Sequence, residues 1–295
     1  MQTLRTADER FVGLSDYALE PHYTDLGSLR MHYLDEGAKT APVALCLHGQ
    51  PTWTYLYRKM IPALLTAGYR VVAPDFLGFG RSDKPVDDNV YTFDFHRSSI
   101  ISLVEVFDLR RIMLVCQDWG GLIGLTIPMD MPGRFERLLV MNTTLGTGDV
   151  PLSEGFLNWR AFSNRNPDMD IAALMKRAVP GLGDLEAAAY AAPFPDARYK
   201  AGVRRFPNLV PDRPDADGAA LSRRARDFWS KTWSGKSFMA VGMKDPVLGP
   251  PVMQALRQVI RNCPLPLELP EAGHFVQEAG DIIVMEAMKS FGSGI

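Results

Sequence analysis

Short runs of apolar residues recur through the first half of the chain and again near its end. Runs of this kind, rich in Val, Ile and Leu, are typical of strands buried on both faces of a parallel sheet. The predicted strands are Met31–Leu34, Val43–Leu47, Arg70–Ala73, Ile112–Cys116, Leu138–Met141, Ser237–Val241 and a run near Leu265–Leu269. The predicted helices are Thr54–Ala67, Phe93–Phe107, Gly120–Met131, a stretch at about Pro251–Arg261 and a last helix from about Gln277. This alternation predicts an α/β fold, with a mostly parallel central sheet and helices on both faces.

The segment from Gly146 to Pro214 differs from the rest of the chain. It is rich in Pro, Ala, Asp and Arg, and it contains helical pieces but no convincing strand. We therefore predict an α/β core made of residues 1–145 and 215–295, interrupted by a helical cap at residues 146–214. An insertion that follows a core strand lies over the carboxyl edge of the sheet, where open α/β sheets bind ligands.

Composition and charge exclude several kinds of partner. The 295 residues include 32 Lys and Arg against 34 Asp and Glu, for a formal net charge of −2, and 46% are hydrophobic. Such a chain can bury a large core, and its balanced charge argues against a nucleic-acid partner. No apolar run reaches the roughly 20 residues of a membrane span. Charges also interrupt the first residues, where a signal peptide would be apolar. We expect a cytoplasmic monomer without a membrane partner.

The cysteines do not suggest a metal or redox centre. Cys46, Cys116 and Cys263 cannot all pair, and none has CxxC spacing. Because Cys46 and Cys116 lie in strand-like runs, we predict buried thiols.

A candidate nucleophile lies where a predicted strand passes into a helix. The residues from Leu114 to Gly121, Leu-Val-Cys-Gln-Asp-Trp-Gly-Gly, resemble the nucleophile elbow of α/β-hydrolases, G-x-S-x-G. Asp118 occupies the Ser position, Gly120 keeps the second Gly, and Cys116 replaces the first. A carboxylate is ionised at neutral pH and can attack a saturated carbon to form an ester. The alternative for Asp118 is an N-cap of the following helix.

A base and an acid follow in the order expected of this fold. Of the five histidines, only His274 lies downstream of Asp118, in a Gly-containing loop between the last strand and the last helix. Asp245 follows the predicted strand Ser237–Val241, although an Asp before Pro could also be a turn residue. The other position for an acid, after Leu138–Met141, holds Asn142. His48, in the loop after Val43–Leu47, is predicted to be structural.

With these residues placed, the sequence resembles a haloalkane dehalogenase of the α/β-hydrolase superfamily over most of its length. The resemblance includes Arg5–Phe11, His48–Arg58, Asp75–Asp83 and Gln117–Gly121. The His-Gly-x-Pro and Gly-Phe-Gly-Arg-Ser stretches occur in several hydrolase families, and Asp-Trp-Gly-Gly is shared with epoxide hydrolases. The resemblance implies an α/β-hydrolase fold.

The residues that bind the leaving halide separate the dehalogenases from other members. The resemblance implies two N–H donors, Trp119 directly after the nucleophile and, in one subfamily, a cap Trp, here Trp159. The other main subfamily uses an Asn where this chain has Gln50 and a Glu where it has Asn142. An indole N–H is a donor without a competing acceptor, so two of them in an apolar cavity suit a large halide. The alternative for Trp159 is an aromatic that packs the cap onto the core.

The resemblance also implies the reaction. Asp118 displaces halide from a small halogenated alkane, and His274, oriented by Asp245, activates the water that hydrolyses the ester. Backbone N–H groups of Gln50 and Trp119 stabilise the oxyanion. The products are alcohol, halide and a proton, and no metal or organic cofactor is required. Phe156, one helical turn before Trp159, is predicted to line the substrate pocket.

Three other functions stay open at this point. An epoxide hydrolase has the same Asp–His–Asp logic and normally uses two cap tyrosines, for which Tyr190 and Tyr199 are candidates. A binding protein of the same fold would keep the pocket and lose turnover. An esterase is disfavoured because no Ser occupies the elbow.

Overall fold

A central eight-stranded sheet organises the structure, a computed structural model that describes residues 1–292. Its strand order is β10-β9-β8-β7-β4-β5-β3-β2. The bounds are β2 His22–Leu26, β3 Leu29–Glu36, β4 Val43–Leu47, β5 Arg70–Pro74, β7 Ile112–Gln117, β8 Phe135–Met141, β9 Lys236–Gly242 and β10 Leu267–Leu269. From β5 to β10 all pairs are parallel, whereas β2–β3 and β3–β5 are antiparallel. The predicted α/β class with a mostly parallel sheet is confirmed.

Most of the strands that the apolar pattern predicted are buried, whereas the edge strand β10 is half-buried to exposed. Every residue of β4 and β7 is buried, because helices cover both faces of the sheet there. The pattern did not predict the edge strand β2, which is mostly half-buried and carries polar residues. It also missed a small second sheet, in which β1 Thr3–Leu4 pairs antiparallel with β6 Lys84–Pro85.

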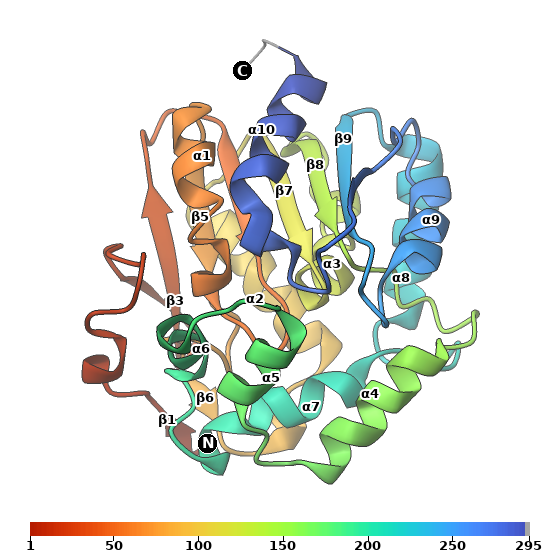
Figure 1. Cartoon of the computed structure of the whole chain (residues 1–295). Coiled ribbons are helices and arrows are strands. Elements are labelled where there is room, and N and C mark those ends of the chain that lie inside the picture. The colour runs from red at the N-terminus through yellow and green to blue at the C-terminus, as the bar shows by residue number, and fades with distance from the viewer. Residues whose placement is uncertain (293–295) are drawn as a thin grey trace.

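Helices flank the sheet on both sides. Figure 1 shows α1 Ile61–Thr66 and α10 Gly280–Phe291 in front of the sheet, and α2 Phe93–Val106 and α3 Trp119–Gly124 behind it. The remaining helices of the core are α8 Ala219–Asp227 and α9 Pro250–Val259. A π-helical turn, Phe228–Thr232, follows α8.

Two predicted helices are shorter than expected because proline interrupts them. The stretch Thr54–Ala67 forms a 3-10 turn at Thr54–Tyr57, and α1 begins afresh just before Pro62. The stretch Gly120–Met131 ends as α-helix at Gly124, and a 3-10 turn begins at Pro128. Proline lacks the N–H that a helix interior needs, and it disfavours helical backbone in the residue before it.

The segment predicted as a cap is helical and covers one edge of the sheet. It contains α4 Glu154–Arg165, α5 Ile171–Ala178, α6 Asp184–Ala191 and α7 Ala201–Leu209, with a 3-10 turn at Ala197–Lys200. In Figure 1 these helices lie below the sheet, at the ends toward which the parallel strands β7 and β8 point. The carboxyl ends of the strands therefore face the cap helices.

A buried ion-pair cluster joins these helices to the core. Arg58 is almost fully buried and donates to Glu278 of the core at 2.8 Å and to Glu186 of α6 at 2.7 Å. Tyr190 of α6 donates to the same Glu278 at 2.5 Å. Breaking one partner of such a cluster leaves a buried charge without compensation, so the cluster keeps α6 in one position.

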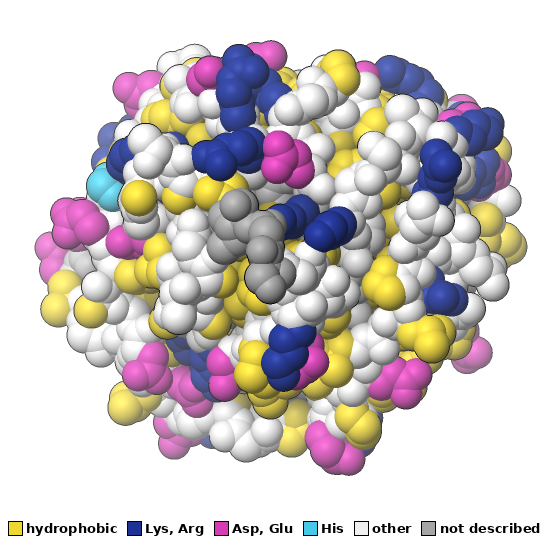
Figure 2. Space-filling view, turned by 90° about the horizontal axis from the view of Figure 1, so that it is seen from above, with side chains coloured by type: hydrophobic (Ala, Val, Ile, Leu, Met, Phe, Trp, Pro, Cys, Tyr) yellow, Lys and Arg dark blue, Asp and Glu magenta, His cyan; other side chains and the backbone are white. Residues whose placement is uncertain are grey.

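The face of the molecule opposite the cap helices carries side chains of both charges. Figure 2 shows the face opposite the cap helices, where acidic and basic side chains are interspersed. Within residues 1–292, no helix is both long and apolar enough to cross a membrane.

A second buried carboxylate organises the loops next to the site. Asp75, at the end of β5, is fully buried and accepts hydrogen bonds from His32 Nδ1 at 2.7 Å and from the backbone N–H groups of Thr54 and Arg81 at 2.7 and 2.8 Å. Burial raises the pKa of Asp75, but His32 and the surrounding donors hold it well below its usual range. The ionised carboxylate thus ties β3 to two loops.

We expect Asp75→Asn to lower the free energy of unfolding by about 3 kcal/mol, because an amide NH₂ would face backbone donors that need an acceptor. Urea unfolding followed by circular dichroism measures the change. Asp281→Asn, at an exposed carboxylate on α10, serves as the control and should change stability by less than about 0.5 kcal/mol. Equal stability of both variants would contradict this role for Asp75.

Candidate active site

Asp118 lies at a tight turn between β7 and α3. Its φ is +51°, in the left-handed region that non-glycine residues rarely adopt. Gly120 makes the turn possible because it has no side chain: a Cβ there would lie 1.9 Å from the carbonyl oxygen of Leu47. The side chain of Asp118 caps no N–H group of α3. Instead its Oδ1 accepts from the backbone N–H of Gln50 at 2.7 Å, which argues against the N-cap interpretation.

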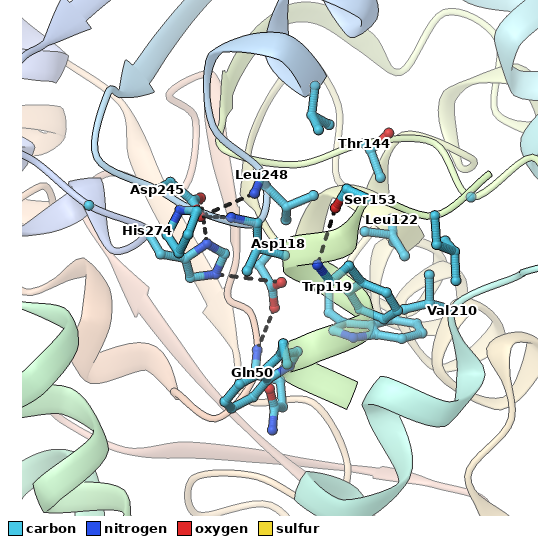
Figure 3. Close-up of a pocket in the computed structure, with 18 of the residues that line it drawn as sticks. Gln50, Asp118, Trp119, Leu122, Thr144, Ser153, Val210, Asp245, Leu248 and His274 are labelled. Carbon is cyan, nitrogen blue, oxygen red and sulfur yellow. Dashed lines mark hydrogen bonds and ion pairs between the residues drawn. The ribbon is translucent and has the colours of Figure 1, made fainter. Parts of the chain in front are cut away.

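His274 joins Asp118 to Asp245. Its Nδ1 lies 2.7 Å from Asp245 Oδ2, and its Nε2 lies 3.6 Å from Asp118 Oδ2 (Figure 3). The three residues come from the turn after β7, the loop after β9 and the loop after β10. Since these parallel strands end at the same edge of the sheet, residues far apart in the sequence meet there.

Both carboxylate oxygens of Asp245 accept hydrogen bonds that fix its position. Its Oδ1 accepts from the backbone N–H groups of Val247 and Leu248 at 2.8 and 3.1 Å, and its Oδ2 also accepts from Asn142 Nδ2 at 2.9 Å. Burial raises the pKa of Asp245, but His274 and these donors lower it to about 2. Asn142 thus takes part in the site, a role that the sequence analysis missed because it looked there only for a carboxylate.

Two carboxylates decide the charge of His274. Burial lowers the pKa of His274, but Asp245 and Asp118 more than offset this effect and raise it to about 10. The imidazolium is therefore stable while both carboxylates are ionised. If Asp118 lost its charge by forming an ester, one of the two groups that raise the pKa would disappear.

A cavity of about 720 Å³ opens above these residues, between the core and the cap helices. Gln50, Asp118, Trp119 and His274 reach it from the core (Figure 3). Phe156 and Trp159 of α4 line it from the cap side. The structure thus brings together in one cavity the residues that the sequence analysis selected from distant segments.

The indole groups of this cavity differ from the others in the chain. Trp53, Trp229 and Trp233 donate their Nε1–H groups to protein oxygens at 3.1, 2.7 and 2.9 Å. Trp119 and Trp159 have no such partner among the described residues. Trp119 is 3% exposed and stacks on Phe206 of α7 at a centroid distance of 4.4 Å. Two indole donors are therefore free to bind an acceptor in the cavity.

The remaining candidates lie elsewhere. Neither Tyr190 nor Tyr199 lines the cavity, and the Tyr190 hydroxyl is already bonded to Glu278. His48 is fully buried, and its Nε2 accepts from the backbone N–H of Phe76 at 3.0 Å, which is the predicted structural role. All three cysteines are free and buried. Among residues 1–292, no group of three or more His, Cys, Asp or Glu side chains could hold a metal ion.

Comparison with known proteins places this site in a family. The alpha/beta hydrolase fold family matches residues 42–281. The chain is 44% identical over 286 residues to a haloalkane dehalogenase of Psychrobacter cryohalolentis and 40% identical over 285 residues to one of Mycolicibacterium paratuberculosis, with 94% of each chain covered. It is also similar to the tetrameric structure of the haloalkane dehalogenase DpaA from Paraglaciecola agarilytica, with a TM-score of 0.97, 51% identity and full coverage of both chains.

The charges around His274 give a direct test of the geometry. Because a neighbouring carboxylate favours the imidazolium, we expect Asp118→Asn and Asp245→Asn each to lower the pKa of His274 by about one unit or more. NMR titration of the imidazole resonances measures this pKa. Glu271→Gln removes an exposed carboxylate from the same loop and should leave it unchanged. A pKa of His274 that does not respond to Asp118→Asn would show that the two side chains are not coupled.

Proposed function

The chain belongs to the haloalkane dehalogenases of the alpha/beta hydrolase fold, and on that premise we propose a role for each residue of its site. The protein hydrolyses haloalkanes and releases an alcohol and a halide ion. The observation that carries the assignment of roles is the Asp118–His274–Asp245 arrangement beside two indole N–H groups that have no hydrogen-bond partner within residues 1–292.

In the first step, an Oδ atom of Asp118 attacks the carbon that bears the halogen. A carbon–oxygen bond forms as the carbon–halogen bond breaks, and the electron pair of that bond leaves with the halide. Trp119 and Trp159 donate their Nε1–H groups to the departing halide and stabilise its developing charge in a cavity whose lining surface is mostly apolar. The product of this step is an alkyl ester on Asp118, which carries no charge.

In the second step, water hydrolyses that ester. Loss of the Asp118 charge lowers the pKa of His274, so its Nε2 can take a proton from water while Asp245 holds Nδ1–H. The resulting hydroxide attacks the ester carbonyl carbon, and the backbone N–H groups of Gln50 and Trp119 bind the oxyanion. Gln50 N–H already points at Asp118 Oδ1, 2.7 Å away. The alcohol leaves, the carboxylate is restored, and a proton is released.

The cap helices complete the substrate site. Residues 146–214 act as a cap on a core made of residues 1–145 and 215–295, and they contribute Trp159 and Phe156 to the cavity. Every group needed for both steps comes from the chain itself, so the reaction uses no cofactor.

A similar protein of known structure bears on the assembly of the chain. The similar protein from Paraglaciecola agarilytica is tetrameric, which favours an oligomer over the monomer expected from the sequence. A cytoplasmic location stays a prediction from the sequence.

Two of the three alternative functions can be distinguished from a dehalogenase. An epoxide hydrolase would need tyrosine hydroxyls directed at the substrate, and neither candidate tyrosine lines the cavity. A binding protein without turnover would retain halogenated ligands unchanged, so release of halide separates it from an enzyme.

We expect purified protein to release bromide from 1-bromobutane and 1,2-dibromoethane, and Asp118→Ala to release none above background. His274→Ala should form the ester but not hydrolyse it, so intact mass spectrometry should show an alkyl adduct after mixing with substrate. The wild type under the same conditions is the control. Steady turnover by His274→Ala without an adduct would contradict the role assigned to His274.

We expect Trp159→Phe to weaken bromide binding about tenfold, because it removes one N–H donor and retains an aromatic ring. The product-inhibition constant for bromide measures this effect. Trp233→Phe is the matched control, since that indole donates to Ser237 and does not line the cavity. Unchanged bromide inhibition in Trp159→Phe would assign Trp159 to packing alone.

A further inference from the structure

Gln117 is a fully buried polar residue that touches the reacting atom of His274. It is the last residue of β7, directly before Asp118. Its amide nitrogen lies 2.8 Å from His274 Nε2 and 3.1 Å from the His274 backbone carbonyl oxygen. The proposed two-step reaction leaves this side chain without a role.

The second contact determines the orientation of the amide. A backbone carbonyl can only accept hydrogen bonds, so the NH₂ group of Gln117, and not its oxygen, faces His274. One N–H then donates to the carbonyl and the other points at Nε2. The amide oxygen is left buried without a hydrogen-bond partner in the described chain. A buried acceptor without a partner lowers the stability of the fold, and in this arrangement the two contacts with His274 offset that cost.

The contact at Nε2 discriminates between the two charge states of the imidazole. Neutral His274, with its proton on Nδ1 facing Asp245, presents a lone pair at Nε2 that accepts from Gln117. In the imidazolium, Nε2 carries a proton, and two donors would face each other across 2.8 Å. The amide cannot turn over to accept that proton, because its oxygen would then face the His274 carbonyl oxygen.

We propose that Gln117 is a positioning residue that holds His274 as the neutral imidazole needed to hydrolyse the alkyl-enzyme. This inference rests on the proposed two-step reaction. The charged groups that face His274 are Asp118 from the turn after β7 and Asp245 from the loop after β9. The exposed Arg177 of α5 and the ion pair of Lys244 with Glu271 also line the cavity.

The contact matters most after the first step. Before alkylation, Asp118 and Asp245 both favour the imidazolium and oppose Gln117. Once Asp118 is an ester, Gln117 acts at Nε2 against Asp245 alone, and the balance moves toward the neutral base. Gln117 therefore keeps Nε2 unprotonated until the hydrolytic water displaces the amide N–H from that lone pair and transfers its proton there, and it takes no part in the displacement of halide.

The test separates the two half-reactions in Gln117→Met, which keeps the length of the side chain and removes the donor. We expect the single-turnover burst of bromide from 1-bromobutane to keep its rate within about twofold. Hydrolysis at pH 7 should slow about tenfold, the size expected for loss of one hydrogen bond to the base. The acid limb of kcat should shift about one pH unit upward, the alkyl-enzyme should accumulate at pH 7, and high pH should restore turnover.

Gln277→Met is the matched control, because Gln277 is equally buried and has no hydrogen bond to His274. It should shift neither the acid limb nor the balance between the half-reactions. Gln117→Asn provides a second variant if Gln117→Met does not fold, since it keeps a buried amide that is one methylene too short to reach both contacts.

Two results would overturn the proposal. One is an equal slowing of alkylation and hydrolysis in both Gln117 variants, and the other is an unshifted acid limb with no rescue at high pH. If the wild type itself released no bromide, the proposed reaction would fail and the role of Gln117 would fall with it, so the two failures are distinguishable.

Discussion

The sharp turn at Asp118 is the constraint on which the site depends. A carboxylate directly before a helix would ordinarily cap the N-terminus of that helix. The positive φ of Asp118 instead places the side chain at the bottom of the cavity, where Gln50 N–H binds one oxygen and His274 lies near the other. Gly120 allows the close packing of this turn, because a Cβ there would collide with the carbonyl oxygen of Leu47.

The electrostatics of the site follow from that placement. His274 lies between two carboxylates, and one of them changes charge during the reaction. While Asp118 is ionised, the imidazolium is favoured and the carboxylate remains a nucleophile. In the reaction that we propose, esterification removes that charge and lowers the pKa of His274, so that a base is present when hydrolysis requires one. The covalent intermediate would thus itself change the pKa of His274 between the two steps.

The cap helices supply the enclosure and the second indole group that the sheet alone cannot provide. The carboxyl edge of a parallel sheet is open, and a halide there would keep its hydration. Helices α4 and α5, with Val210 and Pro211 after α7, cover a cavity of about 720 Å³ above Asp118. Helix α4 adds Trp159, and Phe206 of α7 stacks on Trp119. The Arg58–Glu278–Glu186 cluster fixes α6 to the core from the side. The cavity is therefore shaped by both parts of the chain.

The sequence by itself determined the fold class and most of the buried strands, and it selected the three residues that the structure brings together as Asp118, His274 and Asp245. Buried parallel strands need apolar runs, and the chain order of an Asp at a strand-to-helix turn, a later Asp and a His follows the order of this fold. The apolar pattern did not predict edge strand β2, because half-exposed strands carry polar residues. It also missed the helix breaks before Pro62 and Pro128, because short turns resemble helices in composition. Only the tertiary structure decided that Asn142 and Gln117 belong to the site and that Tyr190 does not. These roles depend on which buried polar atoms face one another across distant segments. The linear sequence does not show which partner an amide or a hydroxyl will have.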